Sequence, residues 1–275
     1  MITALIPTYN CPDALDLCIK SAYEGQQGIN EILVLVDGMA DQNKHVIEKW
    51  KGKVNFLILE ENIGVARILN LGVFQAKSNN ILIVNDDNVF PKNWDVSLSS
   101  LDITNTVVSP NQIEPFSSMF PQFIIKDLGR DPKTFDLKSY WEFENTCSKE
   151  EVTNEGSTFP IYTSKLNWNK VGGYDEQYPS SAGYVADWDL FLKYRLNGIN
   201  TFRSYTCHFY HFVSLTAKSE TEIKKSQIDE RNCHKFAKEK WGSYIGSGVN
   251  TNSKHLQGIK DYKETITNYK YKLNQ

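Results

Sequence analysis

With 275 residues, the chain is longer than most single domains, but one α/β domain with elaborations reaches this length. Hydrophobic residues make up 40% of the sequence and aromatic residues 12%, which is enough for a sizeable core. The formal net charge of -3 shows no basic excess, so overall charge argues against a protein that binds polynucleotides electrostatically.

Cysteine usage and hydropathy indicate in which cellular compartment the protein is expected. The five cysteines are scattered and none has a C-x-x-C spacing, which argues against a disulfide framework or a structural zinc site. The first residues already have the pattern of a strand, without the basic and apolar regions of a signal peptide. No stretch reaches about 18 uninterrupted apolar residues. We therefore expect a cytoplasmic protein without a transmembrane segment.

Strands and short helices alternate over the first ninety residues. The pattern predicts strands at 2–6, 31–36, 54–59 and 81–84, and helices that begin near 10–12, near 41 and near 64. The first helix should have one apolar face, because Leu15, Cys18, Ile19 and Ala22 recur at helical spacing. Strands joined by short helices imply right-handed βαβ units and a parallel sheet.

The second half of the sequence is less regular. Residues 111–155 have no clear period and are interpreted as an elaborated loop region, which either shapes a binding cleft or is a surface insertion. Beyond it, the pattern predicts a strand at 158–163, a strand at 200–206 and helices at 164–171, 187–197 and 220–240. We expect one domain over 1–242, with halves at 1–110 and 111–242, followed by an extension at 243–275.

An acidic cluster follows the fourth predicted strand. The aliphatic residues 81–84 lead directly into Asn85, Asp86, Asp87 and Asn88. Because open α/β sheets bind ligands outside the carboxyl ends of their strands, the two carboxylates are placed to hold a hard divalent cation, which can in turn hold a phosphate. The alternative is that both aspartates cap the next turn.

Polar loops follow all four of the first predicted strands. They are residues 7–10, Asp37-Gly38, residues 61–67 and residues 85–88. In a doubly wound sheet these loops converge on one edge, so their coincidence with strand ends favours a nucleotide site there.

Several motifs occur together in a characteristic order. They are Ile6-Pro7-Thr8-Tyr9-Asn10, Val36-Asp37-Gly38, Asn62-Ile63-Gly64 with Asn70, residues 85–88, Val171-Gly172-Gly173-Tyr174-Asp175-Glu176 and Ala186-Asp187-Trp188-Asp189-Leu190. With them the sequence resembles, over roughly residues 1–215, the inverting nucleotide-sugar glycosyltransferases of family 2. The last three correspond to that family's Asp-x-Asp, Gly-Gly-Phe-Asp-Glu and Glu-Asp-x-Asp-Leu elements. The resemblance implies a GT-A fold, in which a mixed, mostly parallel central sheet is flanked by helices, with a C-terminal helical extension.

The resemblance also implies roles for individual residues at the donor site. The residues that would contact the nucleoside diphosphate of the donor are Pro7, Thr8, Tyr9, Asn10, Asp37, Asn62, Arg67 and Asp86. Asp87 would ligate Mn²⁺ or Mg²⁺ on the diphosphate. Two positions depart from the family, because Asn85 replaces the first Asp of Asp-x-Asp and Asn88 replaces a second acidic residue. A neutral amide is a poorer ligand for these ions, so the metal affinity should be modest.

Asp187 is the expected general base. An inverting transfer is a single displacement, and one carboxylate must take the proton of the acceptor hydroxyl. The alternative makes Asp187 a helix N-cap, and its neighbour Ala186 stands where the family often has Glu. His211 is expected to complete the metal site, with His208 as its competitor and a half-buried strand position as the alternative for both.

Aromatic residues are frequent on the presumed acceptor side. They either stack on a sugar ring or pack in the core; they are Trp141, Phe143, Trp168, Tyr174, Tyr178, Tyr184 and Trp188.

The expected activity is transfer of a sugar from a UDP- or dTDP-sugar donor to an acceptor hydroxyl. Glycan, lipid, protein and nucleic acid all remain open as acceptors, as does the oligomeric state. Three alternatives stand beside it: a nucleotidyltransferase, a non-catalytic nucleotide-sugar-binding module, and a sugar transferase acting on modified nucleic-acid bases. The first usually has a Gly-rich basic loop after the first strand, and residues 7–10 contain neither Gly nor Lys.

Overall fold

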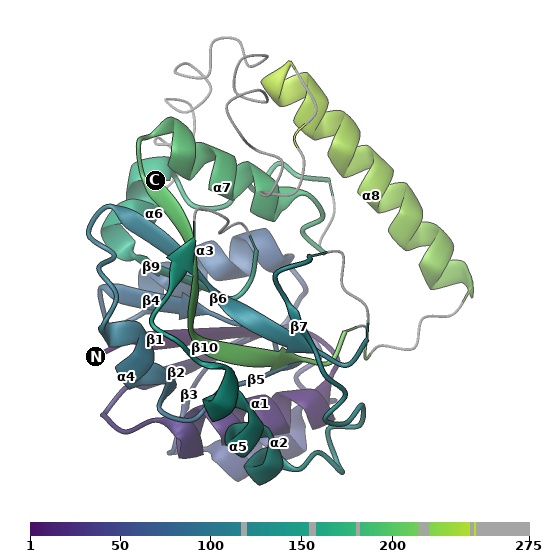
Figure 1. Ribbon diagram of the computed structural model, residues 1–275. Helices are drawn as coiled ribbons and strands as arrows, with labels where there is room; N and C mark the ends of the chain where they lie inside the picture. The colour runs from purple at the N-terminus through teal and green to yellow at the C-terminus, as the bar shows by residue number, and fades with distance from the viewer. Residues whose placement is uncertain are drawn as a thin grey trace.

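The computed structural model describes residues 1–116, 120–153, 158–179, 182–213, 215, 220–242 and 245. Over these residues one sheet runs through the molecule, with helices on both faces (Figure 1). The strands are β1 (Thr3–Thr8), β2 (Glu31–Asp37), β3 (Asn55–Leu59), β4 (Asn80–Ile83), β5 (Asn88–Val89), β6 (Thr106–Glu114), β7 (Ile124–Ile125), β8 (Val152–Thr153), β9 (Ile161–Ser164) and β10 (Asn200–His211). The helices are α1 (Pro12–Gly25), α2 (Lys44–Trp50), α3 (Val65–Gln75), α4 (Trp94–Ser99), α5 (Leu137–Cys147), α6 (Lys165–Val171), α7 (Ala186–Leu196) and α8 (Glu220–Trp241).

The sheet is mixed, and its first four long strands are parallel. The strand order is β3-β2-β1-β4-β9-β6-β10-β5, with β7 beside β6 and β8 beside β10. β1 pairs in parallel with β2 and with β4, and β2 pairs in parallel with β3. The chain then returns through β9, which is antiparallel to both β4 and β6. The expected fold class, a mostly parallel sheet flanked by helices, is confirmed.

Alternating strand residues divide the core into two layers. Leu5, Leu35 and Ile83 face α3, α6, α7 and α8 on one side of the sheet. Ile6 and Val36 face α1, α2 and α4 on the other side. Both strand faces are buried, which explains why these strands are continuous hydrophobic runs rather than alternating ones.

The interpretation of residues 111–155 as an irregular loop region was wrong in part. The buried strand β6 extends to Glu114, and helix α5 begins at the N-cap Asp136, whose carboxylate accepts hydrogen bonds from the backbone N–H groups of Lys138 and Ser139. The polar residues at 111, 112 and 114 of β6 obscured the apolar pattern of a buried strand. Only Leu137, Tyr140 and Glu144 of α5 are fully buried, so its helical period is weak in the sequence.

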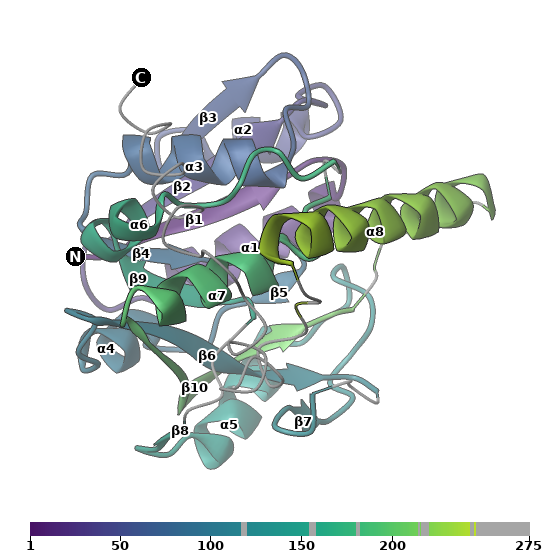
Figure 2. The same cartoon turned by 90° about the horizontal axis from the view of Figure 1, so that it is seen from above.

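Helix α8 is anchored to α7 by a buried charge cluster. The Lys240 ammonium lies 2.5 Å from Asp189 of α7 and 3.0 Å from Asp175. The Trp241 indole N–H donates to the same Asp189 carboxylate at 2.7 Å. Figures 1 and 2 show α8 crossing the end of α7 and extending beyond the sheet. The expected extension at 243–275 lies outside the described residues, apart from Ile245, and the division into halves stays a prediction.

No helix in the described part of the chain combines the length and the apolar character needed to cross a membrane.

Removing the Lys240 ammonium should destabilise the fold strongly. Lys240→Ala removes the ammonium that lies 3.0 Å from Asp175 and is the nearer of two ammonium groups beside Asp189, the other being that of Lys193 at 3.7 Å. Breaking this buried ion pair costs about 3–5 kcal/mol of unfolding free energy. The matched control Lys235→Ala removes an exposed ion pair with Glu239 on the same helix and should cost less than about 1 kcal/mol. Urea unfolding followed by circular dichroism measures the free energy of unfolding of both variants. An equal decrease in the two would contradict the anchoring role of Lys240.

Candidate functional site

A cavity of about 740 Å³ lies at the carboxyl ends of β1, β2 and β4. It is lined by Pro7, Thr8, Tyr9, Asn10, Cys11, Asp37, Asn62, Val65, Ile68, Asn85, Asp86, Asp87, Ala182 and Lys225. The structure therefore brings together every residue expected at the donor site except Arg67. The four polar loops converge as the parallel strand order requires, because the strands all end at the same edge.

Arg67 lies on α3 outside the lining of this cavity. Its Nε is 3.9 Å from a carboxylate oxygen of Glu176, and its side chain is largely exposed. Glu176 also accepts a hydrogen bond from the Asn70 amide at 2.9 Å. These contacts join α3 to the loop after α6.

Asp37 holds the neighbouring loop in place. Its two carboxylate oxygens accept hydrogen bonds from the backbone N–H groups of Ile63 at 2.7 Å and Gly64 at 2.9 Å. Burial raises the pKa of Asp37, and these two hydrogen bonds oppose the increase. Gly64 has φ 90°, a conformation that favours glycine, so the turn that presents Asn62 to the cavity depends on both residues.

Asp86 is held against β1. The Thr8 hydroxyl donates to Asp86 Oδ2 at 2.6 Å. Burial and the adjacent Asp87 carboxylate raise the pKa of Asp86 to about 7, although the Thr8 hydrogen bond lowers it.

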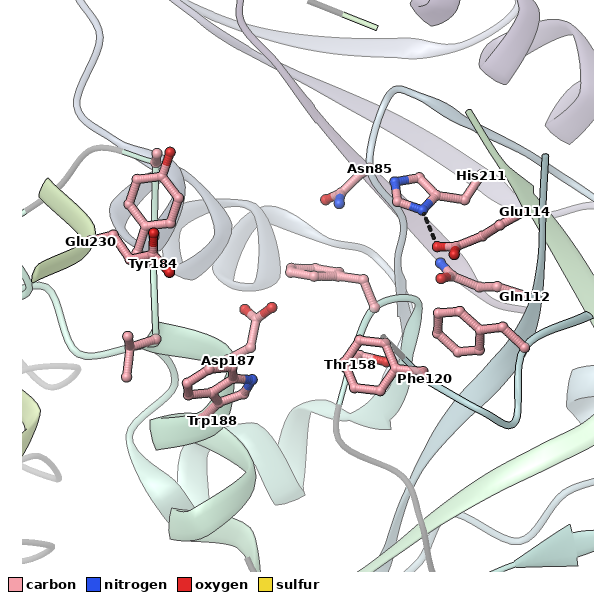
Figure 3. A pocket seen from close by; sticks show the side chains of 15 residues that line it. Asn85, Gln112, Glu114, Phe120, Thr158, Tyr184, Asp187, Trp188, His211 and Glu230 are labelled. Atoms are coloured by element: carbon pink, nitrogen blue, oxygen red, sulfur yellow. Dashed lines mark hydrogen bonds and ion pairs between the residues drawn. The ribbon is translucent and has the colours of Figure 1, made fainter. Parts of the chain in front are cut away.

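His211 lies between two carboxylates. Its Nε2 is 3.4 Å from Asp87 Oδ2. Its Nδ1 is 2.9 Å from Glu114 Oε1, the contact that is dashed in Figure 3. Burial lowers the pKa of His211, but the hydrogen bonds to Asp87 and Glu114 outweigh it and raise the pKa to about 9.

The competing residue His208 lies elsewhere. It is 1% exposed, and its Nδ1 is 3.7 Å from the Glu144 carboxylate of α5. Glu114 was missed by the sequence reasoning because its strand was not recognised.

Asp87 and His211 fit a site for a divalent cation that also binds the donor. Asp87 Oδ1 is buried and has no hydrogen-bond partner among the described residues, which suits an oxygen that binds a ligand. Carboxylate and imidazole are ligands that Mn²⁺ accepts. In the described residues no three His, Cys, Asp or Glu side chains gather as a complete metal site, so further ligands would have to come from the diphosphate.

A second cavity of about 320 Å³ adjoins the first and contains Asp187. It is lined by Asn85, Gln112, Glu114, Phe120, Phe123, Thr158, Phe159, Ala182, Gly183, Tyr184, Val185, Asp187, Trp188, His211 and Glu230. Asn85 and Ala182 line both cavities, so the two spaces meet at these residues. Figure 3 shows Asp187 and Trp188 on one side of the second cavity and His211 with Glu114 on the opposite side.

Asp187 stands in the first turn of α7 with its carboxylate directed into the cavity (Figure 3). The Tyr174 hydroxyl donates to its Oδ1 at 2.8 Å. Burial raises the pKa of Asp187 to about 7, and the Tyr174 hydrogen bond opposes the increase. The predicted N-cap alternative does not describe Asp187, since the N-cap position is Val185.

The aromatic residues divide between core and cavity. Trp168, Tyr174 and Tyr178 are buried in the core layer beneath α7. Tyr184 and Trp188 line the Asp187 cavity. Helix α8 adds Lys225 to the first cavity and Glu230 to the second. Nothing in the spacing of the charged residues along this helix distinguishes these two residues in the sequence.

Comparisons with known proteins agree with this architecture. Residues 3–112 match the model of the family described as Glycosyl transferase family 2. The chain is 26% identical over 114 residues to the amylovoran biosynthesis glycosyltransferase AmsE of Erwinia amylovora, an alignment that covers 39% of this chain and 43% of AmsE. It is 23% identical over 252 residues to the uncharacterized glycosyltransferase RP339 of Rickettsia prowazekii (strain Madrid E), covering 84% of this chain and 69% of that protein.

Solved structures share the fold. S. aureus TarS 1-349 superposes with a TM-score of 0.56 at 14% identity, covering 100% of this chain and 92% of that chain. The mannosyltransferase PcManGT from Pyrobaculum calidifontis, in complex with GDP-Man and Mn²⁺, superposes with a TM-score of 0.53 at 15% identity, covering 82% of this chain and 61% of that chain.

The fold is thus that of the GT-A glycosyltransferases. The family model that matches residues 3–112 and the glycosyltransferase relatives confirm the resemblance to family 2 that was inferred from the motifs.

The Asp37 anchor should matter for nucleotide binding. Asp37→Ala removes two charge-assisted hydrogen bonds to the loop that carries Asn62. The free energy of unfolding should therefore fall by about 2 kcal/mol. The affinity for UDP or dTDP should fall at least about tenfold. Titration calorimetry measures the affinity, with the exposed Asp41→Ala as the matched control. An unchanged affinity in Asp37→Ala would rule out this role.

Proposed function

We propose that this protein is an inverting glycosyltransferase that moves a sugar from a UDP- or dTDP-sugar to a hydroxyl of an acceptor. The observation that carries the proposal is the junction of the two cavities at Asn85. A nucleotide in the first cavity would direct its sugar toward this junction. The acceptor would approach through the second cavity, from the side of Asp187. The solved TarS complex with UDP-GlcNAc, which shares the fold, supports a donor of this kind.

Asp87 and His211 would hold the cation at the donor side of the junction. A divalent cation bound there would neutralise negative charge on the departing diphosphate. Lys225 of α8 lines the same cavity and supplies a further positive charge toward the diphosphate. The proposal accounts for the buried Asp87 oxygen that has no hydrogen-bond partner in the described residues.

Asp187 acts as the general base. Tyr174 occupies Oδ1, and within the described residues Oδ2 makes no hydrogen bond, so it is available to the acceptor hydroxyl. A base with a pKa near 7 is largely ionised slightly above neutral pH and still accepts a proton well. The rate should therefore rise as the pH increases through about 7, because the carboxylate is the active form.

The lining of the acceptor cavity favours an uncharged acceptor. Its walls are aromatic at Phe159, Tyr184 and Trp188, and the carboxylates of Glu114 and Glu230 face the same space. No Lys or Arg is among the described residues that line it. Aromatic faces with acceptor oxygens suit the hydroxyls and apolar faces of a sugar ring. A phosphate would meet the three carboxylates of Glu114, Asp187 and Glu230 and one imidazole, that of His211, so negative charge predominates in the lining. This supports a saccharide acceptor over a nucleic acid.

Asp187→Asn should abolish transfer while nucleotide binding persists. The amide cannot take the acceptor proton, so kcat should fall by about 10² to 10⁴. UDP or dTDP affinity, measured by calorimetry with Mn²⁺, should stay within about twofold, because Asp187 lies outside the nucleotide cavity. Asp102→Asn, at an exposed turn, is the control that should change neither quantity. Full activity in Asp187→Asn would refute its role as the base.

The charge of the acceptor offers a separate test. Uncharged methyl glycosides should stimulate nucleotide release, whereas the same glycosides carrying a phosphate should have a KM at least about tenfold higher. Glu230→Gln should reduce the difference in KM between the phosphorylated and the uncharged glycosides. Glu142→Gln, on the exposed face of α5, should leave that difference unchanged. Preference for the phosphorylated series in the unmodified protein would overturn the inferred acceptor class.

A further inference from the structure

The hydroxyl of Tyr174 touches the proposed base, although Tyr174 itself lies in the core. Its side chain is 2% exposed, and its ring packs edge-on against Trp168 with ring centroids 5.4 Å apart. The hydroxyl donates to Asp187 Oδ1 at 2.8 Å.

Main-chain contacts fix Tyr174 in place. Its backbone N–H donates to Asn70 Oδ1 at 2.9 Å, and the Asn70 amide donates back to its carbonyl at 3.0 Å. Gly172 and Gly173, with φ of 76° and 61°, form the turn that delivers Tyr174 to this position. Asn70 belongs to α3, the helix whose residues Val65 and Ile68 line the first cavity. The tyrosine is therefore held by an element of the nucleotide side of the site. Its hydroxyl consequently has little freedom to leave the carboxylate.

We infer that Tyr174 is a positioning residue for Asp187, orienting the carboxylate so that Oδ2 faces the acceptor and stabilising its charged form. The inference rests on the proposed function, since it assigns a partner to the proposed base. A hydroxyl that donates to a carboxylate stabilises the charged form. Burial acts in the opposite direction on Asp187, so the hydrogen bond offsets part of the cost of a buried base.

Other titratable groups surround Asp187 and have to be separated from this effect. Glu114 of β6, His211 of β10, Glu230 of α8 and Tyr184 line the same cavity. Tyr194 of α7 lies close enough to Tyr174 to influence its ionisation electrostatically. The Asp189 carboxylate, also on α7, is in contact with Lys240, Lys193 and the Tyr178 hydroxyl. A test of Tyr174 must change its hydroxyl alone.

Tyr174→Phe removes only that hydroxyl. The Asp187 pKa should then rise by about one unit, the size expected for a hydrogen bond to a charged group. Carbon-13 NMR of aspartate carboxyls in metal-free protein reads this pKa directly, with the Asp187 signal identified by its disappearance in Asp187→Asn. This readout needs neither donor nor acceptor.

The matched control is Tyr178→Phe. Tyr178 also donates a hydroxyl hydrogen bond to an aspartate of α7, at 3.1 Å, but that aspartate is Asp189, outside both cavities. Tyr178→Phe should lower stability as Tyr174→Phe does, without moving the Asp187 titration. If both variants leave the Asp187 titration at the wild-type position, the positioning role of Tyr174 is wrong.

The kinetic pH profile provides the second readout. UDP release from UDP-GlcNAc or another UDP- or dTDP-sugar, with Mn²⁺, should show the acidic limb of kcat/KM displaced upward by about one pH unit in Tyr174→Phe. Near pH 9 its rate should return to within about threefold of wild type. A uniform loss at every pH would indicate a purely structural role and overturn the inference. If wild type releases no nucleotide while the NMR shift still occurs, the proposed function fails and the hydrogen bond's effect on Asp187 stands.

Discussion

The parallel pairing of β1 with β2 and β4 is the constraint on which the site depends. Since these strands run in one direction, their carboxyl ends and the polar loops that follow them meet at one edge of the sheet. Thr8 and Asp37 are the last residues of β1 and β2, Asp86 follows β4, and all three line one cavity for this reason. A shift of one residue in any of these strands would exchange its two buried faces and disrupt both core layers.

The second half of the chain completes the site by joining the same sheet. β9 lies between β4 and β6, and β10 carries His211 back to Asp87. On the helical side, the Asn70 amide binds the backbone at Tyr174, whose hydroxyl reaches Asp187. The proposed metal ligands and the proposed base therefore stand on elements of both halves, held by strand pairing and by one buried amide.

The sequence predicted the first half of the fold well, because its buried strands are long aliphatic runs separated by helices. Residues 32–36, for example, carry apolar side chains toward both core layers and indicate a central strand. It failed at β6, where buried polar residues such as Asn111 and Glu114 break the apolar pattern. Two polar residues of this strand, Gln112 and Glu114, line the Asp187 cavity, so the feature that hid the strand also hid Glu114.

Residues near the site were predicted where a motif located them at a strand end, and missed where tertiary packing alone brings them in. Asp86 and Asp87 follow a strand directly, but Glu230 reaches the acceptor cavity only because Lys240 and Trp241 fix α8 on α7. Tyr174 lies within a motif, yet its contact with Asp187 thirteen residues later could not be inferred from spacing. Arg67 is the opposite case: the motif placed it at the correct edge of the sheet, but it lies on α3 and its side chain is beside Glu176 rather than in the cavity.

The central claim is that the two cavities form one catalytic site. The most direct measurement is nucleotide release from a panel of UDP-, dTDP- and GDP-sugars, with Mn²⁺ or with EDTA, in the absence of an acceptor. The account predicts slow, metal-dependent release from a UDP- or dTDP-sugar through transfer to water. Absence of both release and nucleotide binding across the whole panel would contradict it.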